Sequence, residues 1–173
     1  MRLPRLLGGV LVLAACTPRP PDIAPNTTPS MDSIVLERTL CFGSCPAYRL
    51  RVSRNGEVLF QNRNPGSTNT AMDTVDAWVP DSLYARAVAS GFFSLPDTIQ
   101  KSRELCPMPA TDHPTIRIKI YGQRPKHVEY YTGCYVAPTG ASGIAHPLIA
   151  MRDFAAHIDT LAQSQRWIQN SQH

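Results

Sequence analysis

Regular alternation of apolar and polar residues along two stretches of the chain predicts two β-hairpins. The first stretch runs from Tyr48 to Phe60, and its halves are separated by Asn55-Gly56, a pair typical of a tight hairpin turn. The second runs from Ile116 to Tyr130 around a turn at residues 122–125, and it has the cleanest alternation in the chain. Alternate residues of a strand point to opposite faces, so we expect one apolar face of each hairpin to lie against a core.

Weaker patterns surround the first hairpin. A β-branched run at residues 33–39 predicts a short strand before it. Residues 62–71 are polar and contain Pro65-Gly66, which predicts a loop, and Val75, Ala77 and Val79 then suggest an edge strand.

Two segments have the apolar spacing of helices. The first begins at Pro80 and ends at Gly91, before two phenylalanines that we expect in the core. The second begins near Pro147 and carries one apolar stripe as far as Ala162. The chain is therefore predicted to be α+β, with an antiparallel sheet built from two hairpins and two helices packed on one face. We expect a single globular domain over residues 33–165, followed by a tail at residues 166–173.

The N-terminal residues 1–15 have the pattern of a signal peptide. Arg2 and Arg5 precede an uncharged apolar run that ends at Ala15 and has about half the length needed to span a bilayer. Residues 13–16, Leu-Ala-Ala-Cys, fit the lipobox of bacterial lipoproteins, which predicts cleavage before Cys16 and attachment of acyl chains, such as palmitate, to it. The alternative is an ordinary secretory cleavage site with an incidental cysteine. Thr17 is not the aspartate that often marks inner-membrane retention, which favours the outer membrane in a host with two membranes.

Residues 16–32 are rich in proline and small polar residues and have no apolar period, so we predict a stalk after the lipidated cysteine. Cleavage before Cys16 removes Arg2 and Arg5 from the 17 lysines and arginines of the chain. The basic residues that remain are nearly balanced by 13 acidic residues. The sequence has no positive stripe of the kind that nucleic-acid binding requires. The expected partner is membrane lipid, reached through Cys16, together with an envelope protein or glycan.

Four cysteines remain after Cys16, an even number that predicts disulfides in an oxidising compartment. Four cysteines allow three pairings. Cys106 and Cys134 flank the second hairpin, so we favour that pair and Cys41 with Cys45.

The outward face of the sheet is the candidate binding surface, provided that the two hairpins are neighbours. An aromatic and basic face of this kind suits an anionic glycan or a partner protein, and the alternative is an ordinary solvated face. Asp112 belongs to the same candidate set, although it and Thr111 also fit a turn that Pro114 terminates. The residues proposed for this surface are Arg49, Arg51, Asp112, Arg117, Lys119, His127, Glu129 and Tyr131.

Several motifs together resemble a bacterial domain of unknown function, number six-four-three-eight in that series. They are Leu-Glu-Arg-Thr at 36–39, Cys-Phe-Gly-Ser-Cys-Pro-Ala-Tyr at 41–48, Gly-Phe-Phe at 91–93, Thr-Asp-His-Pro-Thr at 111–115, Tyr-Thr-Gly at 131–133 and Ala-Pro at 137–138. The resemblance extends from Ser33 to about Ala162 and implies a shared fold and an envelope setting, but no assigned activity. Residues 140–145 and the pair Cys106 and Cys134 depart from the pattern.

Cys41 and Cys45, followed by Pro46, also resemble the Cys-x3-Cys-Pro motif of Sco-type copper chaperones, in which two thiolates and a distant histidine bind copper. The histidines at 113, 127, 146 and 157 are available for that role. In those chaperones the motif lies between a strand and a helix, whereas here a predicted strand follows it.

No catalytic constellation, resident metal site or cofactor is predicted. The sequence therefore favours a non-catalytic binding or structural lipoprotein, with a thiol-redox or copper-binding protein as the alternative.

Overall fold

The computed structural model describes residues 30–100, 105–134 and 147–169. The predicted signal peptide, Cys16, most of the predicted stalk, His146, Ala137-Pro138 and the segment at 140–145 lie outside the described residues.

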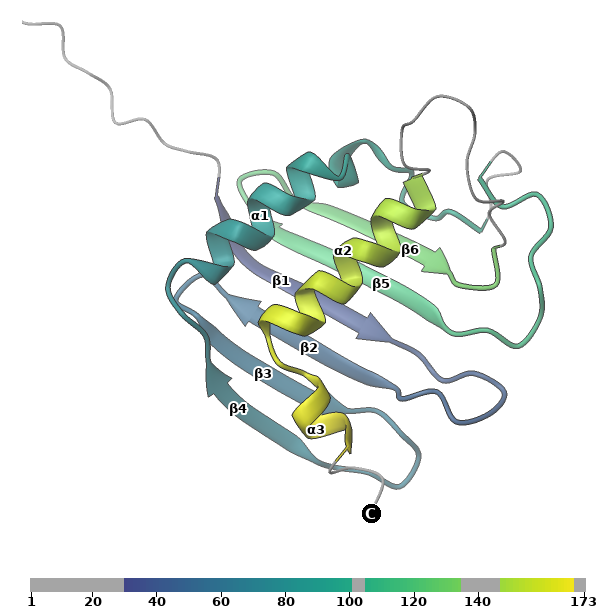
Figure 1. The fold of residues 1–173 in the computed structure, drawn as a ribbon, viewed down its shortest axis with the longest axis horizontal. Helices are drawn as coiled ribbons and strands as arrows, with labels where there is room; N and C mark the ends of the chain where they lie inside the picture. The colour runs from purple at the N-terminus through teal and green to yellow at the C-terminus, as the bar shows by residue number, and fades with distance from the viewer. Residues whose placement is uncertain (1–29, 101–104, 135–146, 170–173) are drawn as a thin grey trace, which may run out of the picture.

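Six antiparallel strands form one sheet in the spatial order β4-β3-β2-β1-β5-β6 (Figure 1). They are β1 (Met31–Arg38), β2 (Tyr48–Ser53), β3 (Glu57–Asn62), β4 (Thr70–Thr74), β5 (Thr115–Gly122) and β6 (Lys126–Tyr131). The β2–β3 and β5–β6 pairs occupy the two stretches of regular alternation. The two hairpins are not direct neighbours, because β1 lies between them and pairs with both β2 and β5.

Three α-helices accompany the sheet, and Figure 1 shows all of them over the same face. They are α1 (Val79–Ala89), α2 (Pro147–Leu161) and α3 (Gln165–Gln169), with a 3-10 turn, η1, at Phe92–Ser94. Helix α1 ends just before Gly91, which is where the sequence predicted a stop. Gly91 has a φ of 71°, in the left-handed region that glycine adopts without strain. The α+β class with an antiparallel sheet is confirmed. The sheet is larger than two hairpins, and the helices number three among the described residues.

The edge of the sheet differs from the prediction. The edge strand is β4 at Thr70–Thr74, inside and just after the predicted loop, whereas Val79 begins α1. Its sequence is largely polar, and only alternate side chains are partly covered. Strand β4 gains ladder hydrogen bonds from one neighbour only and buries little apolar surface, so its sequence pattern is weak.

Both limits of the domain also extend beyond the prediction. Strand β1 begins at Met31, whose side chain is part of the core, two residues before the expected boundary. Helix α3 begins at Gln165 and continues into the residues expected to form a tail, and the ring of Trp167 lies 5.3 Å from that of Phe60. Five residues are too few to show a helical period, so this element was not predictable from apolar spacing.

The core lies between the helices and the inner face of the sheet. Its strand residues are the alternating apolar positions that predicted the hairpins, joined by Ile34 and Leu36 of β1. The disulfide between Cys106 and Cys134 is buried in this core, and a second joins Cys41 to Cys45 between β1 and β2, which is the predicted pairing.

Within the described ranges, no helix combines the length and apolar character that crossing a bilayer requires.

Candidate functional site

The sheet face opposite the helices carries most of the predicted binding residues. The strand register aligns outward side chains in rows that run across the sheet. One row contains Gln61, Arg49, Glu37, Arg117 and Glu129, and the next contains Leu59, Arg51, Val35, Lys119 and His127. We call these two rows the bare face.

A single arginine engages both acidic residues of the bare face. The Nε of Arg117 donates to Glu129 at 2.7 Å, and its Nη1 donates to Glu37 at 3.2 Å. The hydrogen bond to Glu129 is the main cause that raises the pKa of Arg117 above its usual value. The two carboxylates are therefore already paired within the face.

Three other cations of the bare face have no such partner. Arg49, Arg51 and Lys119 form no ion pair with any residue that the structure describes. Arg51 and Lys119 flank Val35 on the two neighbouring strands, which separates their backbones by about 10 Å. Val35 is only 3% exposed although it faces away from the helices, which is consistent with long neighbouring side chains lying over it.

His127 occupies the end of the row that contains Lys119. Its Nε2 atom is buried and has no hydrogen-bond partner within the described part of the chain. Such an atom is normally satisfied by water or a ligand. His127 therefore carries an unsatisfied, buried nitrogen at the end of this row.

Two predicted residues lie apart from these rows. Tyr131 is on the same side of the sheet at the end of β6, where its hydroxyl accepts a hydrogen bond from the backbone N–H of His113. Asp112 lies in the loop before β5 with a φ of 66°, and its side chain accepts a hydrogen bond from the Thr111 hydroxyl. The structure thus places Asp112 in a turn and outside the bare face.

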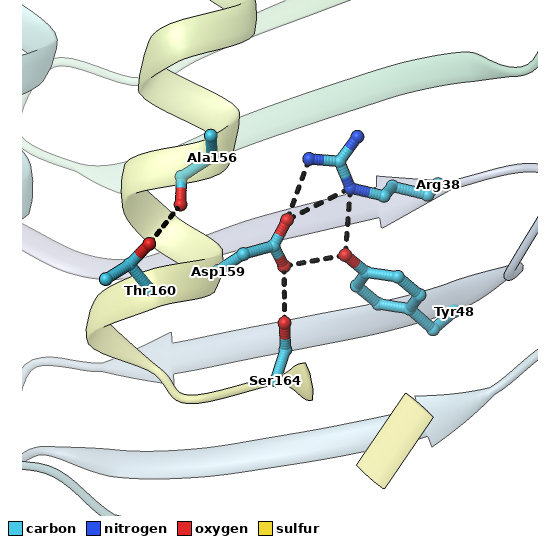
Figure 2. Close-up of polar contacts among 6 residues, drawn as sticks. All are labelled: Arg38, Tyr48, Ala156, Asp159, Thr160 and Ser164. Atoms are coloured by element: carbon cyan, nitrogen blue, oxygen red, sulfur yellow. Dashed lines mark hydrogen bonds and ion pairs between the residues drawn. The ribbon is translucent and has the colours of Figure 1, made fainter. Parts of the chain in front are cut away.

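The helix-covered side holds a different polar group, formed by Arg38, Tyr48, Asp159 and Ser164 (Figure 2). Asp159 of α2 accepts at Oδ2 from Nη2 and Nε of Arg38, at 2.7 and 3.1 Å. Its Oδ1 accepts from the hydroxyls of Tyr48 at 2.6 Å and Ser164 at 2.7 Å. We call these four residues the Asp159 cluster.

The carboxylate of the cluster is saturated by its partners. Burial and the adjacent Asp159 carboxylate raise the pKa of Tyr48 far above its ordinary value, so the phenol stays protonated and donates. Four hydrogen bonds use the lone pairs of the Asp159 carboxylate, which leaves it poorly suited to act as a base or a nucleophile. The arrangement holds α2 and the residues after it to the ends of β1 and β2.

A pocket of about 400 Å³ opens beside the cluster, on the helix side of the sheet. Its polar lining comes from Arg38, Tyr48 and Asp159 of the cluster, together with Thr160 and Gln165. Its apolar lining includes Pro46, Pro114, Ile116 and Ile168. A volume of this size is within the range of small-molecule sites.

The motifs at residues 36–39, 41–48 and 111–115 meet at this end of the sheet. The backbone N–H of Thr39 donates to Thr115 and its hydroxyl accepts from the Thr115 N–H, which ties the first motif to the fourth. The N–H of Phe42 donates to the carbonyl of Asp112. Segments that are 70 residues apart in the chain therefore form one local structure.

Sequence reasoning did not single out Asp159 or Ser164. It named Arg38 only within a motif, and Tyr48 only within a motif and a predicted strand. A signal was available for Asp159. It lies one turn after Ala155 and next to Ile158, on the apolar stripe of α2, and its side chain is only 10% exposed. A carboxylate on such a stripe requires buried partners. Its position therefore predicts a polar cluster but does not identify the partner residues.

The Cys41–Cys45 disulfide lies in the connection between β1 and β2, and Cys45 lines the pocket. Phe42 at the tip of this connection is 89% exposed. Among the residues that the structure describes, no three His, Cys, Asp or Glu side chains gather in a way that could hold a metal ion.

Comparison with known proteins identifies a family but no activity. No curated protein matches the chain. Residues 32–152, well over half of the chain, match the family model described as Domain of unknown function (DUF6438). The resemblance carried by the motifs is therefore confirmed, and the chain belongs to the DUF6438 family.

Proposed function

We propose that this protein is a lipid-anchored envelope lipoprotein whose bare face binds an acidic component of the envelope, in the first place an anionic glycan. The observation that carries the proposal is the set of three cations, Arg49, Arg51 and Lys119, left without ion-pair partners among the described residues. An acidic partner protein is the second class of ligand that these cations could bind.

The strands give these cations a fixed arrangement. An antiparallel sheet commonly has one solvated polar face, so exposure alone carries no functional meaning. Here the cations stand on the central strands β2 and β5, on either side of β1, where the backbone is held by ladders on both sides. Side chains based on rigid elements lose less entropy on binding than side chains on loops.

The pairing within the face supports an anionic ligand over a cationic one. Glu37 and Glu129 both bind Arg117, and Glu57 at the edge accepts a hydrogen bond from Asn55. A basic ligand would have to compete with these existing partners. An acidic ligand meets cations that have no ion-pair partner among the described residues.

The anchor is proposed from the lipobox at residues 13–16 and is supported by the cysteine chemistry. Two disulfides among the remaining cysteines are typical of an oxidising compartment outside the cytosol. Strand β1 begins at Met31, so residues 17–30 are available to connect an acylated Cys16 to the domain.

Fractionation tests the anchor directly. The full-length chain expressed in a bacterial host with two membranes is labelled with an alkyne-bearing palmitate and separated into soluble and membrane fractions. We expect label and membrane association in the wild type and neither in Cys16→Ser. Membrane-associated, labelled Cys16→Ser would overturn the proposed anchor.

Binding to polygalacturonate, a carboxylated glycan, tests the bare face. The double variant Arg51→Ser/Lys119→Ser removes two free cations, and Arg86→Ser/Arg152→Ser removes the same charge from exposed positions of α1 and α2. We expect about tenfold weaker binding at low salt for the first variant and little change for the second. Equal weakening by both variants would show a response to net charge only and would contradict a site on the bare face.

A further inference from the structure

We propose that the pocket beside the Asp159 cluster binds a small uncharged ligand with an apolar body and an amide group. The pocket is on the helix side of the sheet, so this site is separate from the bare face and its test succeeds or fails independently.

The guanidinium of Arg38 is held in place but not fully used. Its Nε donates to Asp159 and to the Tyr48 hydroxyl, and its Nη2 donates to Asp159. Figure 2 shows the other terminal nitrogen of Arg38 without a dashed line, and Nη1 makes no hydrogen bond with the described residues. Since Arg38 lines the pocket and its side chain is 25% exposed, Nη1 offers a positioned donor there.

The charge of Arg38 is already balanced. Asp159 lies 2.7 Å from it and is itself shielded, with a side chain only 10% exposed. A ligand carboxylate would leave one uncompensated negative charge in a half-buried site, which is costly. A carbonyl oxygen accepts from Nη1 without that cost, so an uncharged acceptor is favoured.

Cationic ligands are disfavoured for a complementary reason. Asp159 provides the carboxylate in the pocket lining, and both of its oxygens already accept two hydrogen bonds. A ligand ammonium would have to displace Arg38, Tyr48 or Ser164 from it.

The rest of the lining fits an amide on an apolar body. Gln165, on the exposed rim, has a side chain that both donates and accepts, which matches an amide group. Pro46, Pro114, Ile116 and Ile168 give the site apolar walls. A volume of about 400 Å³ accommodates a compact ligand and excludes a long polymer.

The test uses hexanamide and hexanoate, which have nearly the same shape and differ in charge. Each is titrated into the mature chain carrying Cys16→Ser, with methyl labels on isoleucine, and shifts are followed at Ile116 and Ile168. We expect saturable shifts with hexanamide and roughly tenfold weaker binding of hexanoate. Tighter binding of hexanoate, or no shift of these methyls at any soluble concentration, would overturn the proposal.

Two variants localise the site. Ala156 is exposed on α2 and lines the pocket, so Ala156→Phe fills the site from its rim without a change in the core. Ala85→Phe, at an exposed position of α1 outside the lining, is the matched control. We expect hexanamide binding to be lost in the first and kept in the second, and equal binding by both would contradict the assignment.

Arg38→Lys tests the spare nitrogen. Lysine keeps a cation beside Asp159 and removes the Nη1 donor. We expect hexanamide to bind roughly three- to tenfold more weakly, the contribution of one hydrogen bond. Unchanged affinity in a folded variant would refute the role of Nη1, and Ala156→Phe carries the test should Arg38→Lys fail to fold.

Discussion

The two faces of the sheet use the same chemical groups in opposite ways. On the helix-covered face an arginine and an aspartate meet inside the Asp159 cluster, where every oxygen of the carboxylate has partners. On the bare face Arg117 holds two glutamates at partly exposed positions, and other cations remain unpaired among the described residues. One face uses charge to hold elements together, and the other carries the cations that we propose a partner binds.

Burial explains why the loss of a charge partner should cost more stability on the helix-covered face than on the bare face. A buried charge that loses its partner retains the full cost of desolvation, whereas an exposed charge returns to water. The helix-covered face therefore tolerates little change, and the bare face has freedom to serve binding.

Removal of the Asp159 carboxylate is expected to have the largest effect. Asp159→Ala leaves Arg38 unpaired in a partly buried position and removes acceptors from two hydroxyls. We expect the free energy of unfolding to fall by about 3 to 5 kcal/mol, measured by urea denaturation. A loss below about 1 kcal/mol would mean that the cluster does not hold α2 to the sheet.

The two disulfides extend the comparison to the covalent links. Cys106 and Cys134, 28 residues apart and buried, should contribute about 3 to 4 kcal/mol by restricting the unfolded chain, against about 2 kcal/mol for Cys41 and Cys45. Paired Cys→Ser variants in urea titrations measure both. Thiol counting under mild reductant should find both pairs oxidised, and a readily reduced Cys41–Cys45 that takes up Cu(I) would support the thiol-redox or copper alternative.

Raising the pH into the alkaline range should lower the free energy of unfolding by a smaller amount, through the helix-covered face. The pKa of Tyr48 is raised by its burial and by Asp159, so its contribution is full below pH 10 and falls as pH rises above that ordinary value. Tyr48→Phe should cost about 1 to 3 kcal/mol near neutral pH, and the difference from wild type should shrink above pH 10. Tyr130, whose pKa is also raised by burial, remains in both chains and cancels. A constant difference up to pH 11 would argue against this linkage.

The smallest effect is expected on the bare face. Glu129→Ala breaks the 2.7 Å ion pair with Arg117, which keeps its contact with Glu37. Because all three side chains are about one-third exposed, we expect less than about 1 kcal/mol in the same urea assay, reduced further by salt. A loss comparable to that of Asp159→Ala would remove the distinction between the faces.

The sequence predicted the parts of the fold that follow from period and spacing. The strands of both stretches of alternation, the stop at Gly91 and the apolar stripe of α2 follow from local pattern. The order of strands does not, because the pairing of β1 with β2 and β5 depends on contacts distant in sequence.

The candidate site divides in the same way. Alternation alone placed Arg49, Arg51, Lys119 and His127 on one side of their strands, but their alignment required the register with β1. The Asp159 cluster joins three separate elements, so only its carboxylate left a sign in the sequence, as a charge on an apolar stripe.

The most direct test of the account is a map of where polygalacturonate contacts the domain, obtained from amide chemical shifts of the ¹⁵N-labelled mature chain carrying Cys16→Ser. We predict shifts centred on β2, β1 and β5 around Arg51, Val35 and Lys119, which diminish as salt is added. Shifts centred on α1 and α2, or spread evenly over the surface, would contradict a binding role for the bare face.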